Sequence, residues 1–207
     1  TTNIHDNSYI SSFIDQYNRL MTEGIEADYD MINSFRDEIY SQIDFRDIFF
    51  IDALLAIYIL KTEYSIFSIL PMHSSISKES LVNIVKSNHF VRELWPSQRI
   101  MCENGLFNGK SGVIQMPTGA GKTKALSIAI YSSFSSDNTK LSIVVAPFRA
   151  LCREIYDDLK SDLSFDENIR INQILDLLQI DYVIEELFNP NKKTVVVTTP
   201  EKLLYIL

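Results

Sequence analysis

The chain has 207 residues, of which 46% are hydrophobic and 22% are charged, and this is enough apolar material for one or two globular cores. Its longest apolar run, from Ile48 to Leu60, is too short to span a bilayer and is interrupted by Asp52, which excludes a membrane-spanning protein. Two isolated cysteines, Cys102 and Cys152, are too few for a disulfide framework or a metal site, and no signal peptide is visible, so we expect a cytoplasmic protein.

The first ninety residues are expected to form an all-helical N-terminal domain. They contain one glycine, Gly24, and their apolar spacing predicts helices at about 9–21, 29–43, 46–70 and 78–90, with Pro71 ending the third. A broad apolar stripe on the third helix favours a buried core over an interaction surface; it consists of Ile48, Ile51, Leu55, Tyr58 and Ile59, widened by Phe49 and Phe50.

The formal net charge of −8 is concentrated in this helical region. Residues 1–90 carry 13 acidic and 6 basic side chains, whereas residues 91–207 carry 14 acidic and 13 basic ones. A surface this acidic repels phosphates. We therefore expect residues 1–90 to be a cover, a brace or a protein-docking module, and any nucleic-acid contact to lie in residues 91–207.

Residues 91–207 are expected to form an α/β domain. Apolar segments at 112–116, 141–146, 169–174 and 194–198 predict strands that alternate with helices, which is the pattern of a parallel sheet. Right-handed crossovers would bring the segments that follow these strands to one edge of the sheet, where ligands bind in such folds.

The segment MPTGAGKT at 116–123 predicts a phosphate-binding loop between the strand at 112–116 and a helix at 122–134. Gly119 and Gly121 permit backbone angles and a close approach that a Cβ would forbid. Lys122 is expected to reach the β- and γ-phosphates of a nucleotide, and the Thr123 hydroxyl to hold the Mg²⁺ that bridges them. The cofactors predicted are thus ATP and Mg²⁺, bound by residues 117–123, namely Pro117, Thr118, Gly119, Ala120, Gly121, Lys122 and Thr123.

Four segments together resemble the first RecA-like motor domain of superfamily 2 helicases. The phosphate loop has Met116 and Pro117 where the strict pattern begins with glycine, and this form is similar to motif I of that superfamily. LWPSQ at 94–98 resembles its glutamine motif, IVVAPFRAL at 143–151 resembles motif Ia, and VVVTTPEKLL at 195–204 resembles the next nucleic-acid-contacting motif. The combination is most similar to the Ski-like branch, which includes archaeal repair helicases and RNA exosome helicases, with RecQ-like enzymes next.

The resemblance implies roles for individual residues. Gln98 would read the adenine edge of ATP, although a glutamine on a helix is usually only solvated. Pro147, Arg149, Thr199 and Pro200 would contact nucleic acid. The alternative interpretation of the segment at 195–204 is helix capping with no role in binding. Thr199 suits an N-cap, Pro200 suits the first helical position, and Glu201 suits the positive end of the helix dipole.

Members of the superfamily also carry a DExH or DExD box after the TPE segment, and a second RecA-like domain with arginine fingers. Asp166–Glu167 and Glu185–Glu186 lie before that segment and do not follow an apolar strand, so we interpret them as solvated loop or helix charges. We therefore expect the chain to end inside the first motor domain and not to turn over ATP alone.

The sequence thus predicts a partial RecA-like α/β domain preceded by an all-helical domain, from an ATP-dependent helicase or translocase that acts on single-stranded or duplex nucleic acid. DNA is favoured over RNA, and an anti-phage defence system is the expected setting. Two alternatives stay open. One is a P-loop ATPase that remodels proteins or signals through them, and the other is a protein-binding module in residues 1–90.

Overall fold

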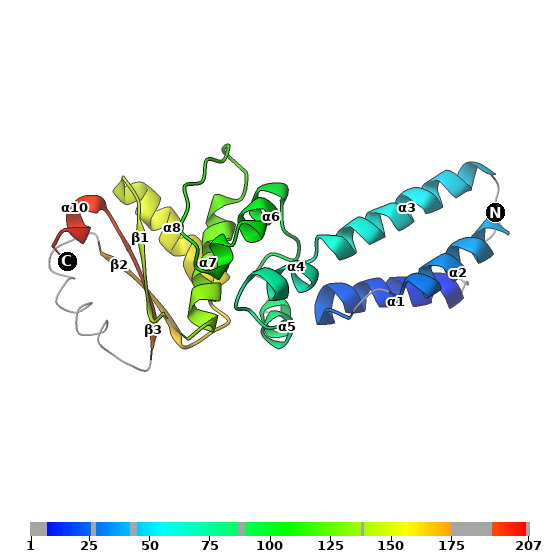
Figure 1. The fold of residues 1–207 in the computed structure, drawn as a ribbon, viewed down its shortest axis with the longest axis horizontal. Helices are drawn as coiled ribbons and strands as arrows, with labels where there is room; N and C mark the ends of the chain where they lie inside the picture. The colour runs from blue at the N-terminus through cyan, green and yellow to red at the C-terminus, as the bar shows by residue number, and fades with distance from the viewer. Residues whose placement is uncertain are drawn as a thin grey trace.

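The computed structural model describes residues 8–25, 28–41, 45–86, 90–137, 139–174 and 192–205. Within them, a helical N-terminal part is followed by helices and a three-stranded parallel sheet (Figure 1). This arrangement confirms the expected α/β class with a preceding helical part. No helix in the described ranges is both long and apolar enough to cross a membrane.

Three N-terminal helices form an elongated arm that projects from the rest of the molecule (Figure 1). They are α1 (Ser8–Glu23), α2 (Tyr29–Tyr40) and α3 (Phe45–Glu63). The Asp28 carboxylate starts α2, because it accepts hydrogen bonds from the backbone N–H groups of Asp30 and Met31 at 3.0 Å. The predicted helices at 9–21 and 29–43 are confirmed, with the second ending at Tyr40 and residues 42 and 43 outside the described ranges. The arm has its own core, formed by Leu20, Met21, Ile32, Phe35, Ile39, Leu55 and Tyr58.

The predicted apolar stripe of α3 is only partly core. Leu55 and Tyr58 are buried, and Ile51 and Ile59 pack against the same cluster, as expected. The prediction that Phe49 and Phe50 widen this core is wrong, since they are 73% and 66% exposed. The reason is that α3 is apolar on all sides, so spacing alone does not tell which side is covered. Its exposed side carries Phe49, Phe50, Leu54, Ile57 and Leu60. A protein-docking role for residues 1–90 stays a prediction.

The predicted single helix at 46–70 is wrong, because the chain breaks between α3 and α4 (Ile66–His73). The Tyr64 carbonyl accepts the Leu94 N–H at 3.1 Å, and Ser65 forms an isolated antiparallel bridge with Glu93. The Ser65 hydroxyl then accepts the Phe67 N–H at 3.2 Å and caps α4. Pro71 lies inside α4 and does not end it.

A second core joins the following helices. They are α5 (Lys78–Lys86), α6 (Pro96–Glu103), the 3-10 turn η2 (Leu106–Asn108) and α7 (Lys122–Ser135). Of the helix expected at 78–90, residues 87–89 lie outside the described ranges. Buried side chains of α4 and α5, such as Leu70 and Ile84, share one cluster with Met101 of α6 and Ile128 of α7. The domain boundary at residue 90 stays a prediction, and this core extends across it.

The parallel sheet has the order β1-β3-β2. Its strands are β1 (Leu141–Val145), β2 (Ile169–Ile174) and β3 (Lys193–Thr198), and its helices include α8 (Arg149–Asp162) and the short α10 (Pro200–Leu203). The predicted strands at 141–146, 169–174 and 194–198 are confirmed within one residue at each end. Val195 and Val197 of the central strand are fully buried and pack in one cluster with Leu159 of α8 and Phe134 of α7.

The strand predicted at 112–116 is wrong. The chain from Ser111 to Pro117 has no regular secondary structure, and the ordered sheet ends at β1 and β2. Val113 is fully exposed and Ile114 is 43% exposed. The run of apolar residues is typical of a buried strand. A strand also needs hydrogen-bonding backbone partners on a neighbouring segment, and none of the described residues supplies them here.

Candidate nucleotide and nucleic-acid site

The predicted phosphate loop is a tight turn that runs directly into α7. The Ala120 N–H donates to the Pro117 carbonyl at 3.4 Å, which closes a four-residue turn with Gly119 at its third position. Gly119 has φ +78° and Gly121, which precedes α7, has φ +75°. Both values lie in the left-handed region that favours glycine. The two glycines of the motif are therefore required by backbone geometry.

Helix α6 holds this loop from one side. The Ser97 hydroxyl donates to the Ala120 carbonyl at 2.9 Å, and the Gln98 Nε2 donates to the Gly121 carbonyl at 3.1 Å. A Cβ on Gly121 would lie 2.7 Å from that Nε2, so a larger residue would displace the Gln98 amide as well as strain the backbone at this φ. The Gln98 side chain is 1% exposed, and its Oε1 accepts the Trp95 N–H at 2.9 Å. Gln98 thus connects the start of α6 with the start of α7.

The start of α7 fits an anionic ligand. Gly121 provides no side chain to cap the helix, and its first turn contains no acidic residue. The first intrahelical bond is from the Ala125 N–H to the Gly121 carbonyl at 3.0 Å, so the preceding N–H groups have no acceptor within the helix. Lys122 is exposed and Thr123 is half-buried at this end. Open space beside Gly119, backbone donors and a positive helix end suit a triphosphate, and the Thr123 hydroxyl suits its Mg²⁺.

Two residues beside the loop were not assigned a role from the sequence, although both lie in the LWPSQ segment. Ser97 holds the Ala120 carbonyl, as described above. Trp95 precedes α6, is 55% exposed, and has its ring Cε3 3.8 Å from the position that a Cβ of Gly121 would take. The LWPSQ motif therefore contained these residues. Their roles could not be predicted from it, because their contacts join segments more than twenty residues apart.

The predicted nucleic-acid residues lie at the carboxyl ends of two neighbouring strands. Val145 and Thr198 are register partners in β1 and β3, and the Ala146 N–H donates to the Thr198 carbonyl at 3.0 Å. Pro147 and Arg149 follow β1 and are exposed, whereas Thr199 and Pro200 follow β3. The structure therefore brings the motif Ia and TPE segments together, as predicted from the parallel sheet.

The TPE segment differs from the capping expected for it. Thr199 precedes α10 and Pro200 is its first residue, but the Thr199 side chain makes no capping bond and is 6% exposed. Hydrogen bonds from the Glu201 backbone N–H, and then from the Thr199 hydroxyl, lower the pKa of the Glu201 carboxyl. The hydroxyl thus serves the Glu201 carboxylate in place of the helix amides.

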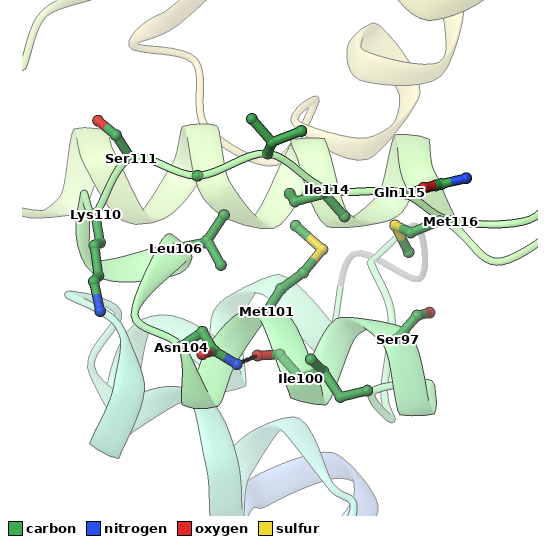
Figure 2. Close-up of a pocket in the computed structure, with 12 residues that line it drawn as sticks. Ser97, Ile100, Met101, Asn104, Leu106, Lys110, Ser111, Ile114, Gln115 and Met116 are labelled. Atoms are coloured by element: carbon green, nitrogen blue, oxygen red, sulfur yellow. Dashed lines mark hydrogen bonds between the residues drawn. The ribbon is translucent and has the colours of Figure 1, made fainter.

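A hollow of about 400 Å³ lies beside the phosphate loop, between α6 and the segment from Lys110 to Met116 (Figure 2). Its walls are mainly apolar, with Met101 and Leu106 pointing toward Ile114 across it and Ile100 also contributing to the lining. Lys122 and Thr123 do not line it. The hollow shares only Met116 with the loop and only Ser97 with the two side chains that hold it, so it is distinct from the candidate phosphate site.

The other reactive side chains have structural surroundings. Burial raises the pKa of the Cys102 thiol to about 11 and also raises that of Cys152, so both are poor nucleophiles near neutral pH. The Asp166 carboxylate accepts the Asn168 N–H at 2.9 Å in the loop before β2. Glu185–Glu186 lies outside the described ranges. Among the described residues, no group of three or more His, Cys, Asp or Glu side chains could hold a metal ion.

Comparison with known proteins agrees with this geometry. A model of the DEAD/DEAH box helicase family matches residues 95–207, which is more than half of the chain. This range contains the phosphate loop and the motif Ia and TPE segments. The chain belongs to the DEAD/DEAH box helicase family. The expected resemblance to the first RecA-like domain of superfamily 2 helicases is confirmed.

Relatives within this family include three named proteins. The chain is 29% identical to the Hachiman protein HamB of Bacillus cereus over 112 residues, which cover 54% of this chain and 10% of that protein. It is 36% identical to human activating signal cointegrator 1 complex subunit 3 over 89 residues, 42% of this chain and 4% of that protein. It is 38% identical to the ATP-dependent DNA helicase Hel308 of Thermoplasma volcanium over 82 residues, 39% of this chain and 11% of that protein. The similarity therefore spans about a tenth or less of each relative.

The bracing contacts generate a prediction about nucleotide affinity. Gln98→Ala removes the donor to the Gly121 carbonyl, so the loop should hold any triphosphate less well; GTP affinity should fall about tenfold and ATP affinity by at least as much. Ser97→Ala is the matched variant, because it removes the neighbouring bond to the Ala120 carbonyl. It should weaken both nucleotides equally. Binding of ATP and GTP is measured by calorimetry, and unchanged GTP affinity in Gln98→Ala would contradict the bracing role.

Proposed function

We propose that the complete protein is an ATP-dependent nucleic-acid helicase or translocase, and that this chain supplies part of its first motor domain. The observation that carries the proposal is the phosphate loop, held by α6 at the start of α7. ATP with Mg²⁺ is the proposed ligand of residues 117–123. When bound, Mg²⁺ neutralises charge on the β- and γ-phosphates, and the chain's own residues position the nucleotide.

The chain's residues would act in three ways. The backbone N–H groups at the start of α7 receive phosphate oxygens, and Lys122 adds a positive charge beside them. The Thr123 hydroxyl orients the cation. Gln98 has one remaining hydrogen-bonding position on its oxygen and one on its nitrogen, because its bonds to the Trp95 N–H and the Gly121 carbonyl use one on each. We propose that these remaining positions recognise the adenine edge, in which case Gln98→Ala weakens ATP more than GTP, beyond the loss common to both.

Nucleic acid is the proposed substrate, bound at the edge formed by the carboxyl ends of β1 and β3. Arg149 and the backbone at Thr199 and Pro200 lie there, on neighbouring strands. Helix starts and single cations can position phosphates without a basic domain. The similarity to an ATP-dependent DNA helicase supports DNA as the favoured strand. We also propose a setting in anti-phage defence, supported by the similarity to the Hachiman protein HamB, and a cytoplasmic location.

The ATPase role is tested by Lys122→Ala in the complete protein. The change removes an exposed cation beside the triphosphate and little buried surface, so ATP hydrolysis should be lost while the free energy of unfolding changes by less than ~1 kcal/mol. Lys86→Ala, at an exposed lysine at the end of α5, is the control and should retain turnover. Turnover and melting temperature are measured together. Retained hydrolysis in Lys122→Ala would contradict the assignment.

The nucleic-acid role is tested by the salt dependence of single-strand affinity in the complete protein. If Arg149 neutralises one phosphate, Arg149→Ala should weaken binding of all sequences about equally and reduce the slope of log affinity against log salt by roughly one unit. Thr199→Ala should weaken binding without changing the slope, since a hydroxyl releases no counterion. Unchanged affinity in both variants would favour the alternative, a P-loop ATPase that remodels or signals through proteins.

A further inference from the structure

A buried acid from α8 reaches the first two turns of α7. Asp162 is the last residue of α8, and its side chain is 1% exposed. One carboxylate oxygen accepts the Ser127 hydroxyl at 2.7 Å, and the other forms an ion pair with the Lys124 ammonium. A buried carboxylate is retained only when it is hydrogen-bonded and paired, and Asp162 meets both conditions through residues of α7.

Both partners are close to Thr123, the residue that would hold Mg²⁺. Lys124 follows it directly in the chain. The Ser127 hydroxyl, 1% exposed, also lies 3.0 Å from the Thr123 carbonyl, so its proton is placed between that carbonyl and Asp162. The carboxylate therefore contacts the first turn of α7 through one neighbour of Thr123, and the second turn through a hydroxyl that touches the Thr123 backbone.

The charges are unusual for the two helices taken separately. Asp162 places a negative charge at the end of α8, and Lys124 places a positive charge in the first turn of α7, and each opposes its own helix dipole. Together the two charges compensate each other. Their pairing also holds the Lys124 ammonium at Asp162, on a different side of α7 from Lys122, since side chains two positions apart on a helix do not face one another.

We propose that Asp162 is a positioning residue for the nucleotide site. Its carboxylate fixes the first turn of α7 through Ser127 and Lys124, and thereby sets the orientation of Thr123 toward Mg²⁺. This inference rests on the proposed binding of Mg²⁺ with ATP at residues 117–123. A purely structural ion pair would affect folding stability alone, whereas a positioning residue affects the Mg²⁺-dependent part of nucleotide affinity.

The test is Asp162→Asn in the complete protein, with ATP affinity measured in the presence of Mg²⁺ and in the presence of EDTA. Asparagine keeps the shape and can still accept the Ser127 hydroxyl, but it loses the charge that holds Lys124. We expect affinity for ATP with Mg²⁺ to fall about tenfold, as for loss of one charge-assisted bond, and affinity without Mg²⁺ to change less than threefold. Asp157→Asn, an exposed acid of the same helix, is the control and should change neither affinity.

Lys124→Met combined with Asp162→Asn separates positioning from a mere charge imbalance, because it removes the cation that Asp162 holds as well as the acid. The double variant should keep the Mg²⁺-dependent loss, because neither side chain can then hold the first turn of α7. Equal losses with and without Mg²⁺, or recovery of wild-type affinity in the double variant, would overturn the positioning role. Absence of ATP binding by the wild type would instead overturn the proposed function, so the two failures are distinguishable.

Discussion

The phosphate loop keeps its shape because α6 holds two of its carbonyl oxygens. Ser97 and Gln98 donate to the carbonyls of Ala120 and Gly121, the two residues that precede α7. The amide groups in the first turn of α7 have no acceptor within the helix, as at any helix start, and the held loop leaves them available to an anion. The left-handed conformation of Gly121 is part of the same constraint, since a side chain there would collide with Gln98. The shape of the proposed nucleotide site thus depends on a contact between two helices rather than on the loop alone.

The helical N-terminal region also contacts α7, near the end of that helix. The Ser132 hydroxyl of α7 is fully buried, donates to the Phe107 carbonyl and accepts the Ser75 N–H at 2.9 Å, so it joins α7 to η2 and to the segment after α4. A buried hydroxyl with partners on both sides fixes the relative position of the segments it connects. Helix α7 is consequently held near its start by α6 and near its end by this serine. The arm formed by α1, α2 and α3 has a separate core and leaves an apolar side of α3 exposed.

Features with local causes could be predicted from the sequence. The glycine spacing of 116–123 and the helix from Lys122 follow from the chain's own backbone. The start of β2 follows from the turn residues Asp166 and Asn168 that precede it. Features with distant causes could not. The break between α3 and α4 depends on a bridge from Ser65 to Glu93, and the missing strand at 112–116 depends on a pairing partner. In the candidate site, Gln98 is indicated by its motif, but its bond to the Gly121 carbonyl joins two distant segments and could not be predicted. The contact between Asp162 and Ser127 could not be predicted either, because no pattern near residue 162 indicates it. The sequence predicts which residues meet the ligand, and packing determines which residues hold them.

The central claim is that the amides at the start of α7 receive the triphosphate, and backbone chemical shifts test it most directly. In a titration of this ¹⁵N-labelled chain with ATP and Mg²⁺, the account predicts the largest amide shift changes at Gly119, Gly121, Lys122 and Thr123. Smaller changes are expected at Ser97 and Gln98, which hold the loop. Saturable changes confined to the apolar hollow around Ile100 and Val113, with none at the loop amides, would contradict it.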